Sequence, residues 1–124
     1  ETLRALPGLH WRHGLGDAEL LALYRHAECL WQPSYAEGFG LPVVEALGLG
    51  TPVALGRGSA LDEVAPGESP RFDPHDAADI HRVLLDIARQ PLPRDLPALT
   101  EWAARYAPAA YRARLDQLLR ELAV

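Results

Sequence analysis

One stretch, residues 29–50, constrains more than any other what this chain can fold into. It opens with an apolar run at 29–31 that has the length and content of a buried strand. Glycines then flank Phe39, Pro42 stands where a first helical turn would begin, and residues 43–49 can continue as a helix. The pattern therefore predicts a strand, a glycine-containing loop and a helix start. In an α/β sheet, that junction is the crevice where ligands bind.

The chemistry of this junction favours an anion. Unpaired backbone N–H groups of the first helical turn and the positive end of the helix dipole attract phosphate, and glycine lets a ligand approach those amides closely. Two carboxylates, Glu37 and Glu45, bracket the turn with seven residues between them. We expect Glu37 in the loop and Glu45 on the first turn of the helix, with both facing the same crevice. A carboxylate accepts hydrogen bonds from two hydroxyls at once, which suits a vicinal diol of a ribose or a hexose.

The segment Glu37–Glu45 resembles the donor-binding motif of retaining GT-B glycosyltransferases of family 4, also called glycosyl transferases group 1, which carry an E-x7-E signature. Three later segments resemble motifs of the same family in the same order. They are Gly50–Ala54, similar to its G-T-P-V strand, Asp62–Val64, similar to its P-E-V turn, and Phe72–Asp76, similar to its D-P-x-D helix entry. The similarity runs from about residue 9 to about residue 122.

The resemblance implies roles for particular residues. Glu45 would hold the ribose hydroxyls of a nucleotide-sugar donor, and Glu37, the one catalytic residue that we assign, would hold hydroxyls of the transferred sugar. The other predicted donor-binding residues offer backbone amides to the sugar and diphosphate or lie beside the nucleobase: Gly38, Phe39, Gly40 and Leu41 for the former, Gly14 and Leu15 for the latter. The alternatives are a solvated loop acid for Glu37 and a carboxylate favoured by the helix dipole for Glu45.

The reaction implied by the resemblance is transfer of a sugar to an acceptor hydroxyl with retained anomeric configuration. The donor would be a UDP-, GDP- or ADP-sugar, and the acceptor, a glycan, lipid or small molecule, would bind through an N-terminal domain that this sequence lacks. We expect no metal and no other cofactor, because fixed dipoles and basic side chains stabilise the leaving diphosphate in this fold. The family supplies a lysine for that diphosphate upstream, whereas all twelve basic residues here are arginine. The chain by itself is therefore expected to be inactive.

Two other functions compete with this interpretation. The chain could be a non-catalytic nucleotide-sugar-binding module or a self-associating module, since it lacks the acceptor domain and the phosphate lysine of the family. A carboxylate pair also occurs in glycoside hydrolases, where one member must be a protonated acid. An anion-binding helix start beside Glu45 favours an ionised hydrogen-bond acceptor instead, so hydrolysis is disfavoured. Arg57 is a further candidate for the donor diphosphate, and its alternative is a solvated loop arginine.

The resemblance and the hydrophobic pattern together predict the fold. We expect an α/β protein, an incomplete Rossmann-like three-layer α/β/α domain with a mostly parallel sheet, corresponding to the C-terminal half of a GT-B donor domain. Residues 1–124 would form a single partial nucleotide-sugar-binding domain. Its parts are a truncated helix tail at 1–8, an α/β core at 9–90 and C-terminal helices at 91–124.

Within the core, Leu9–His13 reads as a short strand, and Asp17 as the N-cap of a helix whose apolar stripe, including Tyr24, is core packing. Three adjacent parallel strands follow between residues 30 and 74. Their open edge would be hydrophobic. Either the first strand slides into the gap, or copies of the chain form a homo-oligomer through that edge, or the chain folds poorly alone.

Charge and cysteine content limit the partners and the compartment. Seventeen acidic residues outnumber the twelve basic ones, the net charge is −5 and no basic run occurs, so we expect no nucleic-acid surface. His10 and His13 have the odd spacing that points strand residues to opposite faces, which disfavours a metal pair. A lone Cys29 and the absence of a membrane-length apolar segment favour the cytoplasm. Because the sequence begins with Glu1 and contains no methionine, we expect it to be a piece of a longer protein or the product of a truncated reading frame.

Overall fold

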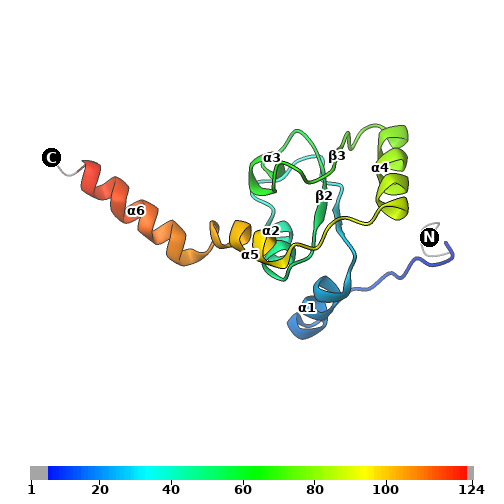
Figure 1. Ribbon diagram of the computed structural model, residues 1–124, viewed down its shortest axis with the longest axis horizontal. Helices are drawn as coiled ribbons and strands as arrows, with labels where there is room; N and C mark the ends of the chain where they lie inside the picture. The colour runs from blue at the N-terminus through cyan, green and yellow to red at the C-terminus, as the bar shows by residue number, and fades with distance from the viewer. Residues whose placement is uncertain (1–5, 123–124) are drawn as a thin grey trace.

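The computed structural model describes residues 6–122 of the chain. Its sheet has three parallel strands in the order β1-β2-β3. Their bounds are Leu30–Gln32 for β1, Val53–Gly56 for β2 and Arg71–Phe72 for β3 (Figure 1). This arrangement confirms the three adjacent parallel strands expected from the sequence. The helix tail expected at 1–8 lies largely outside the described residues.

In residues 6–122, six helices surround or extend from this sheet (Figure 1). They are α1 (Asp17–His26), α2 (Leu41–Gly48), α3 (Leu61–Val64), α4 (Ala77–Arg89), α5 (Leu96–Ala104) and α6 (Pro108–Leu122). The last of them, α6, projects away from the rest of the molecule, and none of its described residues is buried. The buried core is therefore formed by the sheet and helices α1 to α5.

The two faces of the sheet bury different sets of side chains, because successive residues of a strand point to opposite sides. On one face, Trp31 of β1 and Phe72 of β3 stack with ring centroids 4.1 Å apart and an interplanar angle of 3°. The small Ala54 of β2, paired with Trp31 in the ladder, lies in the same buried cluster. Helix α4 covers this face with Val83 and two neighbouring isoleucines, Ile80 and Ile87.

The opposite face carries the larger core. Val53 and Leu55 of β2 are almost fully buried there against α2, α3 and α5. Helix α2 contributes Leu47, which is completely buried. With α4 on one side of the sheet and α1, α2, α3 and α5 on the other, the packed part of the molecule is a small three-layer α/β/α unit. The sequence predicted this architecture.

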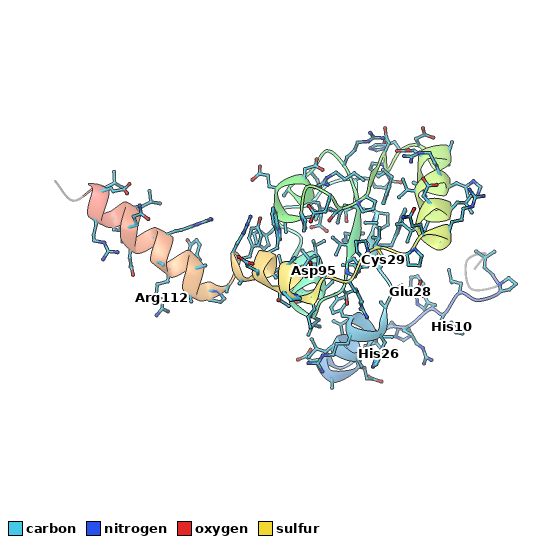
Figure 2. The ribbon with its side chains drawn as sticks, viewed as in Figure 1. His10, His26, Glu28, Cys29, Asp95 and Arg112 are labelled. Atoms are coloured by element: carbon cyan, nitrogen blue, oxygen red, sulfur yellow. The ribbon has the colours of Figure 1, made fainter. Side chains whose placement is uncertain are left out.

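The prediction of a strand at Leu9–His13 is wrong. Those residues are exposed and form no strand in the described part of the chain. A strand needs a neighbouring ladder for its backbone groups, and a locally suitable sequence does not provide one. Figure 2 shows His10 on this segment, outside the packed layers. The segment therefore does not slide into the gap beside β1, and β1 pairs only with β2 among the described residues.

The start of α1 also differs from the expectation. Asp17 is the first helical residue, and Gly16 is the N-cap. The Gly16 N–H donates to Oε2 of Glu19 at 3.1 Å, so the carboxylate satisfies a donor at the helix start. Because an acid is also favourable in the first turn of a helix, Asp17 suits this position as well as the predicted one.

Candidate functional site

The junction between β1 and α2 has the strand–loop–helix form that the sequence predicts. Gly40 is the N-cap of α2 and adopts a left-handed conformation, with φ at 97°. A Cβ at this position would lie 2.3 Å from Cδ2 of Leu61, so both the backbone and the space around it favour glycine. Pro42 occupies the first turn of the helix. Pro42 has no N–H, and the N–H groups of Val43 and Val44 donate to the Gly40 carbonyl at 3.0 and 3.4 Å. Among the described residues no hydrogen bond is found for the Leu41 N–H, so this amide at the start of α2 is available to a ligand.

Glu37 is held by two side chains at the carboxyl end of β1. Its Oε1 atom accepts hydrogen bonds from Nε2 of Gln32 and from Oγ of Ser34, both at 3.1 Å. Nε2 of Gln32 also donates to Oγ of Ser34 at 2.9 Å. All three residues are half-buried. Glu37 is thus not a freely solvated loop acid, and the sequence analysis did not identify either of its partners.

Glu45 is held from a different element. It lies on α2 as an exposed residue, and its Oε2 atom accepts a hydrogen bond from the Tyr24 hydroxyl of α1 at 3.4 Å. Burial, and then the neighbouring Glu45 charge, raise the pKa of Tyr24. The ring of Tyr24 is buried in the core, as expected, but its hydroxyl reaches the site. A tyrosine in an otherwise aliphatic stripe was the available signal, because a buried phenol needs a polar partner.

Glu45 is not on the first turn of its helix. Since α2 begins at Leu41, Glu45 is its fifth residue, and the first turn contains no acidic side chain. The helix dipole acts mainly on the first turn, so it is a weak explanation for this carboxylate. The contact with Tyr24 gives a more specific one.

A buried threonine fixes the position of Tyr24. Thr51, two residues before β2, is completely buried, and its hydroxyl donates to the Tyr24 carbonyl. Arg94 then joins the two segments, because Nη2 donates to the Thr51 hydroxyl at 3.0 Å and to the Ala27 carbonyl at 2.8 Å. The C-terminal end of α1 is thereby attached to the segment that precedes β2. This attachment places the Tyr24 hydroxyl beside α2.

The remaining predicted residues occupy two places. In the loop, Phe39 is exposed and its ring meets Tyr106 edge-on, with centroids 5.6 Å apart, while Gly38 and Leu41 are exposed. Gly14 and Leu15 precede α1. In the described part of the chain, no hydrogen bond joins Gly14 or Leu15 to Glu37 or Glu45.

Arg57 follows β2 at the same edge of the sheet, and it forms an ion pair. Its Nη2 atom lies 2.6 Å from Oδ2 of Asp79 on α4. Asp79 also accepts the Asp73 N–H at 2.8 Å and pairs with Arg82 at 2.5 Å. The Asp73 N–H, followed by Arg82, lowers the pKa of Asp79. The Arg57 guanidinium therefore has an ion-pair partner, and a phosphate would have to compete with the Asp79 carboxylate to bind it.

The loops after β1 and β3 also meet at this edge. The rings of Tyr35 and His75 lie with their centroids 4.6 Å apart, and Tyr35 is 65% exposed. A Cβ on Gly56 would come within 2.7 Å of the Ser34 carbonyl oxygen, so the loop after β1 packs directly on β2. The predicted crevice edge is thus a real meeting point of three loops.

Neither a metal centre nor a membrane span is found in residues 6–122. No group of three or more histidine, cysteine, aspartate or glutamate side chains there could hold a metal ion. Figure 2 shows His10 and His26 on separate segments. None of the described helices is both long and apolar enough to cross a membrane. Burial raises the pKa of the half-buried Cys29 thiol to about 11.

Comparison with known families agrees with the motifs. Residues 2–110 match the family described as Glycosyl transferases group 1. The chain belongs to this family. The match includes the junction at β1 and α2 and all three of the later segments that resembled family motifs.

Relatives in the family are sugar-transferring enzymes. The chain is 43% identical over 88 residues to the MMP alpha-(1->4)-mannosyltransferase of Mycolicibacterium hassiacum, covering 66% of this chain and 21% of that protein. It is 39% identical over 102 residues to the D-inositol 3-phosphate glycosyltransferase of Streptomyces coelicolor, covering 80% of this chain and 22% of the relative. The chain thus spans about a fifth of the length of these two curated relatives.

A solved structure confirms the fold class. The sucrose-phosphate synthase of Thermosynechococcus elongatus superposes with a TM-score of 0.71 at 31% sequence identity, covering 89% of this chain and 29% of that one. The small parallel sheet with its flanking helices therefore matches part of a GT-B glycosyltransferase.

Proposed function

We propose that this chain is the donor-binding part of a retaining glycosyltransferase that moves a sugar from a nucleotide-sugar to an acceptor hydroxyl. One observation carries the proposal: one carboxylate lies in the loop before the glycine-capped helix α2, another lies on that helix, and a different element contacts each of them. Glu37 is bound by residues from β1 and its loop, and Glu45 by Tyr24 of α1. This arrangement suits a ligand with two separate diols and a diphosphate between them.

In this proposal Glu45 binds the ribose and Glu37 the transferred sugar. The amides of Gly38, Phe39, Gly40 and Leu41 bind the sugar and diphosphate, and Gly14 and Leu15 contact the nucleobase. The donor is a UDP-, GDP- or ADP-sugar, no metal is needed, and the acceptor binds a separate N-terminal domain. The whole chain, 1–124, acts as one partial domain in the cytoplasm and is inactive alone.

Calorimetric titration of the chain with UDP, GDP, ADP and their common sugar conjugates tests the proposal. We expect one nucleotide series to bind and Glu45→Ala to weaken it by about tenfold or more, because the charged hydrogen bonds to the ribose are lost. Glu101→Ala is the matched control, since Glu101 is an exposed acid on α5 and should leave binding unchanged. A folded chain that binds no nucleotide contradicts the proposal. Measurable sugar transfer by the chain alone contradicts its inactivity.

A second candidate is a self-associating module. The edge of β1 that faces away from β2 carries no strand among residues 6–122, and unpaired strand edges are templates for another chain. A homo-oligomer would form through that edge. Sedimentation at increasing protein concentration checks it: a monomer at all concentrations excludes self-association, and an oligomer that binds no nucleotide favours it over donor binding.

A further inference from the structure

We propose that Gln32 and Ser34 are positioning residues that hold Glu37 in one orientation and leave its second oxygen free for the donor sugar. This inference rests on the proposed function. It goes beyond the two-glutamate motif, because it assigns the sugar-facing geometry of Glu37 to the last residue of β1 and to the loop that follows.

The direction of each hydrogen bond in this group follows from chemistry. A carboxylate only accepts, and the amide nitrogen of a glutamine only donates. Nε2 of Gln32 therefore donates to Oγ of Ser34 and to Oε1 of Glu37. Ser34 has a single hydroxyl proton, and it donates that proton to the same Oε1 atom. The three hydrogen bonds join Gln32 Nε2, Ser34 Oγ and Glu37 Oε1 pairwise, so these atoms form a closed triangle.

This triangle saturates one oxygen of Glu37 and not the other. Both hydrogen bonds to the carboxylate go to Oε1, and in the described part of the chain none goes to Oε2. Oε2 is therefore the atom available to a sugar hydroxyl. Glutamate otherwise loses substantial side-chain entropy on binding, and a carboxylate that is already oriented avoids most of that loss.

The two positioning residues are themselves fixed by the sheet. Gln32 ends β1, where it pairs with Leu55 of the buried strand β2. The carbonyl of Ser34 packs so closely on Gly56 that a Cβ there would come within 2.7 Å of its oxygen. Orientation is thus transmitted from a rigid strand, through Gln32 and Ser34, to the carboxylate. A site supported in this way is more exact than one carried by a loop alone.

The inference predicts a selective effect on binding. If Glu37 contacts the transferred sugar, loss of its support weakens binding of a nucleotide-sugar and leaves binding of the nucleoside diphosphate unchanged. A purely structural defect would weaken both ligands together. The difference between the two ligands therefore separates positioning from folding.

Calorimetric titration with UDP against UDP-glucose, and with GDP against GDP-mannose, measures this difference. We expect Gln32→Leu and Ser34→Ala each to weaken the nucleotide-sugar roughly two- to tenfold, the range for losing one hydrogen bond, with no change for the diphosphate. Ser34→Thr keeps the hydroxyl and should restore binding. Gln90→Leu, an exposed glutamine at the end of α4, is the matched control.

The outcomes separate the inference from the function on which it rests. A folded chain that binds no nucleotide overturns the proposed function and, with it, this role in donor recognition. A chain that binds both ligands with a ratio unaltered by Gln32→Leu and Ser34→Ala overturns the positioning role alone. Without any ligand, the side-chain amide resonances of Gln32 in NMR spectra should move in Glu37→Ala and in Ser34→Ala. Resonances that stay in place in both variants overturn the triangle itself.

Discussion

Helices α5 and α6 follow one another in the chain, but only α5 packs against the core. Helix α5 packs on α2, buries Ala103 and partly buries Leu99 and Trp102. Helix α6 is longer and carries more large apolar side chains, yet none of its described residues is buried (Figure 1). The exposed apolar residues of α6 are Tyr111, Leu115, Leu118, Leu119 and Leu122. Apolar content therefore does not decide which helix joins the core.

The difference lies in what each helix meets. The end of α2 presents Gly48 and Gly50, and a Cβ on Gly50 would lie 2.2 Å from Cδ1 of Leu96 at the start of α5. At the other end of α5, Nε1 of Trp102 donates to the Val64 carbonyl at 2.8 Å. Helix α5 thus finds a matching surface and a hydrogen-bond partner. Helix α6 finds neither within the described residues, so its leucines contribute little to the stability of this chain.

The largest expected effect tests this contrast with one substitution at two sites. Leu47→Ala removes a completely buried side chain of α2 and should lower the free energy of unfolding by about 2–5 kcal/mol. Leu118→Ala on α6 makes the same change at a side chain that is 54% exposed, and should alter stability by less than about 0.5 kcal/mol. Urea denaturation measures both. Equal losses would mean that α6 is packed in solution.

The second-largest effect is expected at Gly56, a glycine in the packed region of the sheet. Gly56→Ala places a Cβ 2.7 Å from a backbone oxygen, which cannot move aside as a side chain can. We expect a loss of about 1–3 kcal/mol in thermal or urea unfolding, because the loop after β1 must shift. Gly67→Ala is the control, since a Cβ at that turn meets nothing within 4 Å. If both variants lose the same stability, the close approach at Gly56 is not the cause.

The hydrogen bond of α5 gives a smaller effect. Trp102→Phe keeps a large ring but removes the donor to the Val64 carbonyl, and should cost about 1–2 kcal/mol. Tyr111→Phe on α6 removes a hydroxyl from a side chain that is 69% exposed, and should cost almost nothing. Chemical denaturation of the two variants side by side checks this. A wild-type midpoint for Trp102→Phe would show that packing alone holds α5.

The smallest effect concerns α4, which is anchored partly by charge. Because the pKa of Asp79 is lowered in the folded state, its stabilising contribution is present above the ordinary carboxyl pKa, about 3.9, and is lost as pH falls through the folded value. Asp79→Asn should therefore flatten the loss of stability on acidification below about pH 4. Urea midpoints at pH 7 and pH 3 measure the change. An unchanged acid profile would remove Asp79 from the causes of acid sensitivity.

Local pattern was sufficient for much of the candidate site. The order strand, glycine loop and helix at residues 29–50 rests on residues close together in the chain, and Glu37 and Glu45 were identified from their spacing within it. Gln32 was missed although the sequence contains a signal for it. The signal is an amide side chain that ends an otherwise apolar strand directly before Pro33. Tyr24 was expected in the core, but its contact with Glu45 was missed because the two residues lie 21 positions apart in the chain.

Arg71 shows the same limit in the loop before β3. The sequence predicted three parallel strands between residues 30 and 74, and Arg71 begins the last of them, β3. In the structure its guanidinium donates to the carbonyls of Pro66, Gly67 and Ser69 at 3.3, 3.1 and 2.8 Å, and its Nε pairs with Asp62 at 3.1 Å. One side chain thus organises the turn. Sequence periodicity cannot predict these hydrogen bonds, because they depend on how the loop before β3 folds back over Arg71.

By itself the sequence identified the family through the resemblance of its motifs. Glycine, proline and apolar spacing act over a few residues, and they determined the parallel α/β architecture and the placing of Glu37 in the loop before α2 and of Glu45 on that helix. Tertiary structure alone decided that Leu9–His13 forms no strand, that α5 packs and α6 does not, and that Gln32, Ser34 and Tyr24 orient the two glutamates. The physical reason is the same in each case. A ladder, a packed helix face and a hydrogen bond between distant residues all require a partner whose position the chain sets only when it folds.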